Sequence, residues 1–310
     1  MLISFVVPAY NASQTISRSL NSVFNQSLPD QWTVEVIVVD DGSQDSIELA
    51  KVVAQFSHIR LVVHEKNRGM CAGRNTGINA SSGEIVIILD ADDEMVSNWP
   101  ITLQDILEEW PVEINVCYAA CRNTKGQITA SEPTYNGFLT LEDVLNERHS
   151  GEYLPMFRGD YIRNKNYLDL KMRKSCGVVS YINFALDGPF YISNRVLRTY
   201  HDAQMGSVSS MWYSPKKSVE TSCCYDELLR RYGDLYKKYA PRMYQSKLLR
   251  LAIYQRFGGK AGALNNWRQG ISFHLWKESL GVTVVLIAGP TFGSWIVRFT
   301  KKIGLIRKYG

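Results

Sequence analysis

Four apolar runs of strand length alternate with helical segments in the first 90 residues, and this alternation limits the possible folds more than any other feature. The runs are Ile3–Tyr10, Thr33–Asp41, Ile59–Glu65 and Glu84–Asp90. Strands that alternate with helices through short links form βαβ units, which build a mostly parallel sheet. The second run is almost wholly apolar, which is typical of a strand covered on both faces. The sequence therefore predicts an α/β domain with helices on both sides of its sheet.

The segments between these runs have the spacing of helices. The predicted helices are Ala12–Gln26, about Ser46–Phe56 and Gly69–Ser81. Beyond Trp110 the pattern loosens. One more strand is predicted at Ile114–Asn123 and a helix at Leu139–Arg148, and from Pro215 onward the chain is mainly helical and basic.

Three of the predicted strands end in a polar cluster. The clusters are Tyr10-Asn11, Asp40-Asp41 and Asp90–Asp93. In open α/β sheets, ligands bind outside the carboxyl ends of the strands. Three clusters at this edge by chance would be unusual, so the sequence indicates a binding site there.

The acidic cluster "ILDADDE", Ile88–Glu94, places three aspartates within four residues directly after an apolar run. Like charges this close repel one another, so a positive partner is expected. Carboxylate oxygens suit Mg²⁺ or Mn²⁺, and one or two carboxylates with substrate phosphates is the usual arrangement. Asp90 and Asp92 alternate along the loop and can face one point. The alternative is a solvated turn in which Asp92 or Asp93 caps the next helix.

The other polar residues at this edge each have two interpretations. Asp40 and Asp41 either cap the following helix or accept hydrogen bonds from a nucleobase or ribose. Tyr10 either stacks on a base or packs at the rim of the core. Arg74, in the third predicted helix, either pairs with a diphosphate or lies on the surface.

Four segments together are far more specific than any one of them. They read "VVPAYN", "VVDDGSQD", "NRGMCAGRNTGI" and "GEIVIILDADDE". Their order and spacing resemble those of the family-two glycosyltransferases over about residues 1–110, and more weakly to Ser209. The resemblance implies an inverting enzyme of the GT-A fold, a Rossmann-like sheet sandwiched by helices, that uses a nucleotide diphosphate sugar. A dehydrogenase is disfavoured because no GxGxxG follows the first strand.

The resemblance also implies roles for particular residues. Tyr10 corresponds to the base-stacking aromatic, and Asp41, with Asp40, to the contact with base and ribose. Arg74 corresponds to the arginine near the phosphates. The full nucleotide-sugar site implied is Pro8, Tyr10, Asn11, Asp40, Asp41, Asn67, Arg74, Asp90 and Ala91.

The metal site is implied in the same way. Asp90 and Asp92 correspond to the family's DxD motif, with Asp92 the expected direct ligand. Asp90, Asp93 and His201 are further candidates. The ion, Mn²⁺ or Mg²⁺, would bridge the diphosphate and neutralise charge as the nucleotide leaves.

Inversion requires a general base near the acceptor hydroxyl, and here the chain departs from the family. The family's Asp is expected on a helix that corresponds to Val178–Leu186, but no Asp or Glu occurs from Leu170 to Leu186. Tyr181 lies near the expected position, and a tyrosine of ordinary acidity is a poor base at neutral pH. Three explanations stay open: Asp187 serves, another acid serves, or the chain is catalytically weak or inactive. The other candidate acids are Asp160, Asp169 and Asp202.

Charge is distributed unevenly along the chain. Residues 216–310 hold 18 Lys and Arg against 5 Asp and Glu, a balance of +13, whereas residues 1–215 hold 17 against 25, a balance of −8. The uncharged run Ser279–Val297 approaches the ~20 residues that span a bilayer, but Gly and Pro interrupt it. We expect a segment that lies on an anionic membrane surface, with a single span or a pair of core helices as the alternatives.

Two further features of the sequence indicate the cellular compartment of the protein. The six cysteines are scattered without zinc-type pairs, which favours reduced cytosolic thiols over disulfides. The first residues lack the pattern of a signal peptide. We therefore expect a cytoplasmic protein, peripheral at the inner face of the cell membrane.

These features predict two regions. Residues 1–215 form the GT-A domain, with 1–115 as the nucleotide-sugar half and 116–215 as the acceptor half, and residues 216–310 form a helical, basic, membrane-associated region. The predicted function is sugar transfer from a UDP-sugar to a saccharide or lipid-linked saccharide in bacterial cell-surface polysaccharide or O-antigen synthesis. The alternative is a degenerate relative that binds nucleotide but lacks the base. No nucleic-acid partner is expected, because no recognised nucleic-acid-binding module accompanies the basic region.

Overall fold

The structure is a computed structural model that describes residues 1–171, 177–201 and 215–302, with side chains described up to Gly289. The chain divides into two compact units, Met1–Asp202 and Ala203–Gly310. The first unit contains the sheet and the second is helical. The finer division of the first unit into a nucleotide-sugar half and an acceptor half stays a prediction.

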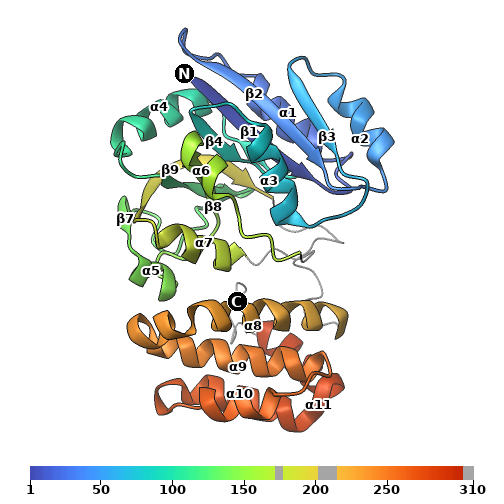
Figure 1. The fold of residues 1–310 in the computed structure, drawn as a ribbon, viewed down its shortest axis with the longest axis vertical. Helices are drawn as coiled ribbons and strands as arrows, with labels where there is room; N and C mark the ends of the chain where they lie inside the picture. The colour runs from blue at the N-terminus through green and yellow to red at the C-terminus, as the bar shows by residue number, and fades with distance from the viewer. Residues whose placement is uncertain (172–176, 202–214, 303–310) are drawn as a thin grey trace. The chain divides into compact units, whose positions relative to one another are not determined.

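The first unit is built on one nine-stranded sheet (Figure 1). Its strands are β1 Leu2–Ala9, β2 Thr33–Asp40, β3 Ile59–Val63, β4 Ile85–Ile88, β5 Glu94–Met95, β6 Val116–Asn123, β7 Gly137–Leu139, β8 Tyr153–Arg158 and β9 Phe190–Tyr200. The order is β3-β2-β1-β4-β8-β6-β9-β5, and β7 pairs with β9. The four strands predicted in the first 90 residues pair in parallel, which confirms the predicted α/β fold.

The later strands make the sheet mixed. β8 runs antiparallel to both β4 and β6, whereas β6 and β9 are parallel to each other. Arg158, at the end of β8, pairs with Ile85, at the start of β4. Because of this direction, the beginning of β8 lies toward the edge where β4 ends, and the end of β8 lies at the opposite edge.

Helices cover both faces of the sheet, as predicted. The helices α1 Ile16–Phe24, α2 Ser46–Val53 and α4 Trp99–Glu109 pack on one face, and α3 Met70–Ala80, α6 Gly159–Lys165 and α7 Gly177–Ala185 pack on the other. Successive side chains of a strand point to opposite faces. In β1, Phe5 and Val7 therefore join the first core and Val6 joins the second.

One predicted helix, residues 139–148, is shorter in the structure. It is α5, Leu141–Leu145, because Leu139 belongs to β7 and Thr140 caps the helix. The Thr140 hydroxyl oxygen accepts from the Asp143 N–H, and the Asp143 carboxylate accepts from the Thr140 N–H. This reciprocal capping box sets the helix start.

The second unit is helical. Its elements are α8 Pro215–Tyr239, α9 Pro241–Phe257, α10 Ala263–Gly270, the short 3-10 helix η1 Phe273–Leu275 and α11 Trp276–Lys302. α9 packs against α8, α10 and α11. Among the described residues no single helix is long and apolar enough to cross a membrane. One pair bent by 106°, Ala263–Gly270 with Phe273–Gly289, meets the length and composition that a span needs.

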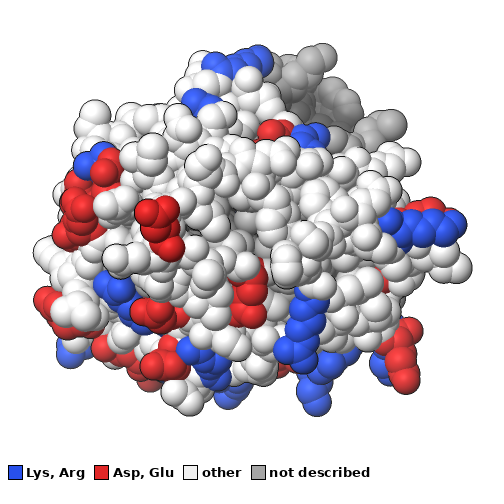
Figure 2. Space-filling model, turned by 90° about the horizontal axis from the view of Figure 1, so that it is seen from above, with Lys and Arg blue, Asp and Glu red and all other residues white. Residues whose placement is uncertain are grey.

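Charged side chains of both signs are interspersed on the face of the molecule shown in Figure 2. Acidic and basic groups lie close together around much of its margin, and uncharged residues fill most of its centre. Among the described residues visible there, no large patch has a single sign.

Candidate functional site

The ends of β1, β2 and β4 bring the three polar clusters to one edge of the sheet, as predicted. The Asp41 N–H donates to the Ala9 carbonyl (2.8 Å), which fixes the end of β2 beside the end of β1. On the other side of β1, β4 pairs in parallel as far as Ile88, just before Asp90. Tyr10, Asp41 and Asp90 therefore follow three neighbouring strands.

Asp40 is fully buried, and both of its carboxylate oxygens are engaged in the turn after β2. Oδ1 accepts from the Ser43 N–H (2.9 Å), and Oδ2 accepts from the Ser46 hydroxyl at the start of α2. These bonds fasten the turn to the helix. Asp40 has no exposed surface in this structure, and its contact with a nucleotide stays a prediction.

Asp41 is also buried and holds the loop that leads into α3. Its Oδ1 accepts from the Arg68 N–H (2.9 Å) and lies 2.7 Å from His64 Nδ1, and its Oδ2 accepts from the Gly69 N–H (2.8 Å). The other ring nitrogen, His64 Nε2, lies 2.9 Å from Thr76 Oγ1 in α3. Asp41 thus joins β2, β3 and α3, and its contact with base or ribose stays a prediction.

Gly42 lets the turn after β2 approach the loop before α3. Its φ of +68° lies in the left-handed region that favours glycine. A Cβ atom there would lie 2.4 Å from the carbonyl carbon of Lys66 and 2.6 Å from the nitrogen of Asn67. Asn67, a predicted nucleotide-sugar residue, is half-buried here, and its Oδ1 atom has no hydrogen-bond partner among the described residues.

Tyr10 and its neighbours form the rim of this edge. Tyr10 is 45% exposed and can present its ring to a ligand. The Asn11 N–H donates to Ser43 Oγ (2.9 Å), and Asn11 Oδ1 accepts from the Gln44 N–H (2.8 Å), so Asn11 ties this rim to the turn after β2. Pro8 lies beyond the last pair between β1 and β4, so its missing N–H costs no bond to β4.

Asp90 lies between two arginines. Its Oδ1 is 3.3 Å from Arg74 Nη2, and its Oδ2 is 3.5 Å from Arg198 Nη1. The Asp90 side chain is 38% exposed, whereas both arginines are buried. Burial acts to lower the pKa of Arg74, but the Asp90 carboxylate raises it, and the net shift is upward. Arg74 therefore stays charged at the edge where the sequence predicted a phosphate contact.

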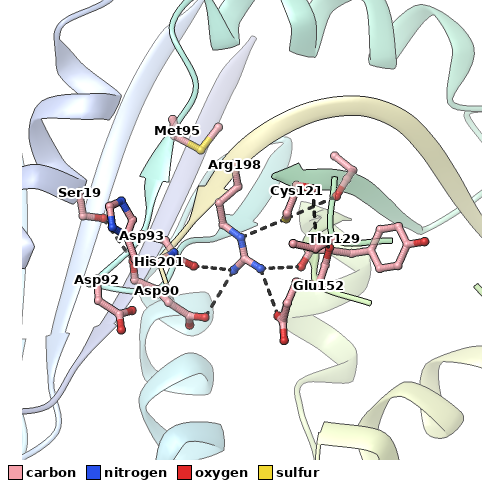
Figure 3. Close-up of polar contacts among 12 residues, drawn as sticks. Ser19, Asp90, Asp92, Asp93, Met95, Cys121, Thr129, Glu152, Arg198 and His201 are labelled. Atoms are coloured by element: carbon pink, nitrogen blue, oxygen red, sulfur yellow. Dashed lines mark hydrogen bonds and ion pairs between the residues drawn. The ribbon is translucent and has the colours of Figure 1, made fainter. Parts of the chain in front are cut away.

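Arg198, near the end of β9, was not predicted from the sequence, yet it connects the acidic cluster (Figure 3). Its Nη1 lies 3.1 Å from Asp93 Oδ2, its Nη2 lies 3.4 Å from Glu152 Oε2, and its Nε donates to Cys121 Sγ (3.1 Å). Burial acts to lower the pKa of Arg198, whereas Cys121, Asp93 and Asp90 act to raise it, and the net shift is upward. A guanidinium of the chain itself is therefore one positive partner of the aspartates.

The other two aspartates have different surroundings. Asp92 is exposed, and Figure 3 shows its carboxylate to one side of the cluster. Desolvation, and then the charge of Asp90, raise the pKa of Asp92. Asp93 is buried, and its Oδ1 accepts from the His201 N–H (2.9 Å). Burial raises the pKa of Asp93 to about 7 in spite of Arg198.

His201, a candidate metal ligand by sequence, pairs with Glu94 in this structure, and its role as a ligand stays a prediction. Its Nε2 lies 2.8 Å from Glu94 Oε1. Arg18 of α1 also pairs with Glu94 (3.0 Å) and donates to the carbonyl oxygen of Asp92. These contacts fasten the acidic loop to α1 and to the end of β9.

The carboxylates of the loop decide whether a divalent ion fits there. Within the described parts of the chain, no three His, Cys, Asp or Glu side chains are grouped to hold an ion by themselves. Asp92 offers an exposed carboxylate, and Asp90 a partly exposed one whose contacts with the arginines are long. One or two carboxylates completed by phosphate oxygens and water suit Mg²⁺. The residues therefore fit an ion held jointly with a diphosphate, and the DxD assignment stays a prediction.

Two of the predicted general bases are poorly suited in this structure. Tyr181 lies in α7, at the expected place, but burial raises its pKa, which keeps the hydroxyl protonated at neutral pH. Asp187 follows α7 and is already paired with Lys165 (2.7 Å) and with the Tyr161 hydroxyl (2.8 Å).

Of the remaining predicted acids, the structure places Asp160 away from the aspartate cluster. Asp160 is exposed and begins α6 directly after the end of β8, so it lies at the opposite edge of the sheet from Asp90. Asp169 lies between α6 and α7 and accepts from the Lys171 N–H (2.8 Å). Asp202 lies outside the described residues.

Glu152 is an acid at the site edge that the sequence analysis missed. It directly precedes β8, whose beginning lies toward the edge where β4 ends. Figure 3 shows the carboxylates of Glu152 and Asp90 on the same side of the Arg198 guanidinium. The Glu152 side chain is 38% exposed, and desolvation raises its pKa while Arg198 acts to lower it. Its position depends on the antiparallel direction of β8, which no pattern in the sequence indicates.

Comparison with known proteins places the first unit in a family. The sequence profile described as Glycosyl transferase family 2 matches residues 4–167. The chain is 35% identical over 178 residues to the uncharacterized glycosyltransferase YibD of Escherichia coli strain K12, covering 53% of this chain and 50% of YibD. It is 36% identical over 97 residues to Escherichia coli WfgD, named a UDP-Glc:alpha-D-GlcNAc-diphosphoundecaprenol beta-1,3-glucosyltransferase, covering 31% and 37%. The chain thus spans half or less of the length of these relatives.

The fold has a solved counterpart. The crystal structure of S. aureus TarS 1-349 in complex with UDP-GlcNAc aligns with a TM-score of 0.55, covering 93% of this chain and 81% of that chain at 17% identity. Likeness at this identity concerns the fold alone. It supports the predicted architecture of an α/β sheet with helices on both faces.

Proposed function

The chain belongs to glycosyl transferase family 2, and on that premise we propose that it transfers a sugar from a nucleotide diphosphate sugar, with inversion, to a saccharide acceptor. The observation that carries this proposal is the polar edge of the sheet. There an exposed aromatic, Tyr10, and an exposed carboxylate, Asp92, accompany a buried cation, Arg74. A nucleoside diphosphate needs a stacking surface, a metal-binding carboxylate and fixed positive charge.

The proposed donor is a UDP-sugar. One relative and one structural neighbour support this choice: WfgD is named for UDP-Glc, and TarS was crystallised with UDP-GlcNAc. In this chain Tyr10 would stack on the uracil, with Asp41 and Asn67 close to the base and ribose.

The positive charge of the site would act on the leaving diphosphate. Asp92, with Asp90, would hold a divalent ion that, when bound, offsets the charge developing on the leaving group. Arg74 adds permanent positive charge beside Asp90 (3.3 Å) without rearrangement during the reaction. Arg198 is buried and would not touch the donor. It is a positioning residue that holds Asp90 and Glu152 from inside the fold.

For the general base we propose Glu152. Its carboxylate would take the proton from the acceptor hydroxyl as that oxygen bonds to the anomeric carbon. The bond from this carbon to the diphosphate oxygen breaks, and its electron pair leaves with the nucleotide. The raised pKa of Glu152 brings the group nearer to neutral pH and strengthens it as a base, and Arg198 keeps it ionised.

The proposed acceptor is a lipid-linked saccharide in bacterial cell-surface polysaccharide synthesis, at the cytoplasmic face of the membrane. The name of WfgD, which specifies a diphosphoundecaprenol-linked acceptor, supports this proposal. The degenerate, nucleotide-binding alternative gains no support from the described residues or from these relatives.

A thermal-shift panel tests the donor site. Ligands that bind the native state raise its apparent stability by mass action. We expect UDP and UDP-sugars with Mn²⁺ to raise Tm more than UDP alone, and other nucleoside diphosphates to have less effect. If no nucleoside diphosphate raises Tm with or without Mn²⁺, the proposed function is wrong. Binding without hydrolysis or transfer over a panel of donors would favour the degenerate alternative.

The variant Glu152→Gln tests the base. General-base catalysis typically contributes about 10²–10⁴-fold, so kcat should fall by that factor while the UDP-induced shift in Tm persists. The wild-type kcat should also fall as pH decreases through the raised pKa of Glu152, and the variant should lack this limb.

The matched control is Glu142→Gln, which alters another partly exposed carboxylate that lies near an arginine, Arg148 (3.8 Å). Its kcat should equal that of the wild type. Full activity of Glu152→Gln, or an unchanged acidic limb of its pH profile, would exclude Glu152 as the base.

A further inference from the structure

One face of the second unit is apolar and exposed. We call it the apolar stripe, and it consists of Phe273, Trp276, Leu280, Val284 and Ile287, which are 87%, 57%, 58%, 41% and 80% exposed. With 3.6 residues per turn, the four members in α11 fall within about 80° of the helix circumference. The stripe is therefore continuous along one side of the helix.

The opposite side of α11 is already buried. Val282 packs on Leu249 and Ala252 of α9, and Val285 packs on Phe257. A surface helix normally presents charged and polar residues to solvent, opposite its buried face. From Trp276 to Gly289 the charged residues are Lys277 and Glu278, both at the beginning. The second apolar side of this helix is thus the kind of surface that marks a binding face.

We propose that the apolar stripe inserts into the surface of an anionic lipid bilayer. Trp276 lies at one end of the stripe, and the Nζ of Lys277 lies 5.5 Å from its ring centroid. Tryptophan and lysine are the residues that meet lipid headgroups, with the aromatic ring at the interface and the ammonium group in water. Apolar residues then follow on the side that would face the acyl chains.

The charge of this unit matches such a partner. Residues 215–289 contain 13 Lys and Arg against 5 Asp and Glu, and Arg298, Lys301 and Lys302 follow in the sequence. Basic residues near an apolar helix are attracted by the negative potential of anionic lipids. A neutral apolar partner would gain nothing from this excess of positive charge.

The dimensions favour a helix that lies on the bilayer over one that crosses it. The helix from Trp276 to Gly289 is about 20 Å long, shorter than the ~30 Å hydrocarbon core. Gly289 has a non-helical backbone (φ 74°, ψ 178°), which ends the straight segment. On the other side, the α10 axis is bent by 106° from the following helix.

This inference rests on the surface of the second unit and not on the proposed chemistry. Sedimentation with vesicles tests it without any enzyme assay. The full chain is mixed with large vesicles of phosphatidylcholine, with or without phosphatidylglycerol. We expect the chain to sediment with the phosphatidylglycerol vesicles, and less with pure phosphatidylcholine. High salt should weaken the binding because it screens the basic residues.

The decisive variant carries Leu280→Ser and Ile287→Ser. Losing two apolar side chains from the interface should weaken partitioning by at least about tenfold. The matched control carries Ile101→Ser and Val112→Ser, which remove two side chains of the first unit with similar exposure, 62% and 82%. The control should bind vesicles like the wild type, and both variants should keep the UDP-induced shift in Tm if the donor proposal is right.

Two results would overturn the inference. One is a wild-type chain that ignores phosphatidylglycerol vesicles, or a stripe variant that binds them equally well. The other is a wild-type dimer, measured by light scattering without lipid, that the stripe variant converts to a monomer. The second result would assign the stripe to contact between two copies of the chain. A circular-dichroism melt of each variant shows whether lost binding reflects lost folding.

Discussion

Two acidic turns follow β2 and β4, on either side of β1, and their carboxylates have different partners. In the first turn, Asp40 and Asp41 are buried. Their carboxylate oxygens bond to backbone N–H groups, a hydroxyl and His64 at normal hydrogen-bond distances. In the second turn, Asp90 meets arginines at 3.3 and 3.5 Å, and Asp92 is exposed. Two similar sequences thus form different turns. In the first, the carboxylates are hydrogen-bonded within the protein, and in the second, carboxylate oxygens remain available for a ligand.

The largest expected effect is the loss of activity when the exposed carboxylate of the second turn is replaced by an amide. Asp92→Asn should reduce kcat by about 10³-fold, because an amide is a weak metal ligand and the charge on the leaving diphosphate would be less well offset. Its free energy of unfolding should change by less than about 0.5 kcal/mol, since Asp92 is exposed. Steady-state kinetics and urea unfolding measure the two quantities. An unimpaired kcat would show that the second turn does not hold the metal.

The next effect is a loss of stability when the guanidinium of Arg198, which pairs with the carboxylates of the second turn, is removed. Arg198→Met leaves the buried carboxylate of Asp93 without its cation and should lower the free energy of unfolding by about 3 kcal/mol. Arg198→Lys keeps the charge but loses the planar fork of donors, so it should recover part of this stability. Urea unfolding at pH 7 provides the measurement. Equal stability of wild type and Arg198→Met would mean that Arg198 is not needed to balance the cluster.

The same Asp→Asn change in the first turn should have the opposite outcome. Asp41→Asn replaces one acceptor oxygen by an amino group next to a buried N–H donor and weakens the pair with His64. The free energy of unfolding should fall by about 1–3 kcal/mol. The kcat of the molecules that remain folded should change much less than in Asp92→Asn. A stability equal to wild type would remove the distinction between the two turns.

The smallest effect concerns the residue between the turns. Tyr10 follows β1 and is 45% exposed, so Tyr10→Ala should barely alter stability. Loss of base stacking should raise the Kd for UDP by about tenfold, in line with stacking energies of roughly 1–3 kcal/mol. The conservative variant Tyr10→Phe should bind UDP like the wild type. A Kd unaffected in Tyr10→Ala would place the base elsewhere.

The fold of the amino-terminal half could be predicted because each of its strands and helices is marked by the pattern of apolar residues within a short segment. β1, β2 and β3 are apolar runs that are each followed by a helix, and parallel βαβ units bring the ends of β1 to β4 to one edge. The positions of Tyr10, Asp41, Arg74 and Asp90 at that edge follow directly. The roles of Asp40 and Asp41 within the turn do not, because they depend on which N–H groups the folded loop presents.

Arg198 and Glu152 could not be predicted because their contacts are not local. Arg198 is 108 residues from Asp90 in sequence, and β9 carries no pattern that marks one of its arginines as buried. Glu152 reaches the site because β8 enters the sheet antiparallel to β4. The helix α7 carries no Asp or Glu at the place where the family's base is expected, whereas the direction of β8 brings the acid Glu152 to the site edge.

Calorimetric titration of UDP with and without Mn²⁺, on the wild type and on Asp92→Asn, tests most directly whether the turn after β4 holds the donor. The wild type should bind UDP more tightly with Mn²⁺ than without it. Asp92→Asn should lose this dependence on Mn²⁺ and retain the weaker, metal-free binding. If Asp92→Asn binds UDP with the same affinity and the same Mn²⁺ dependence as the wild type, the second acidic turn does not hold the diphosphate.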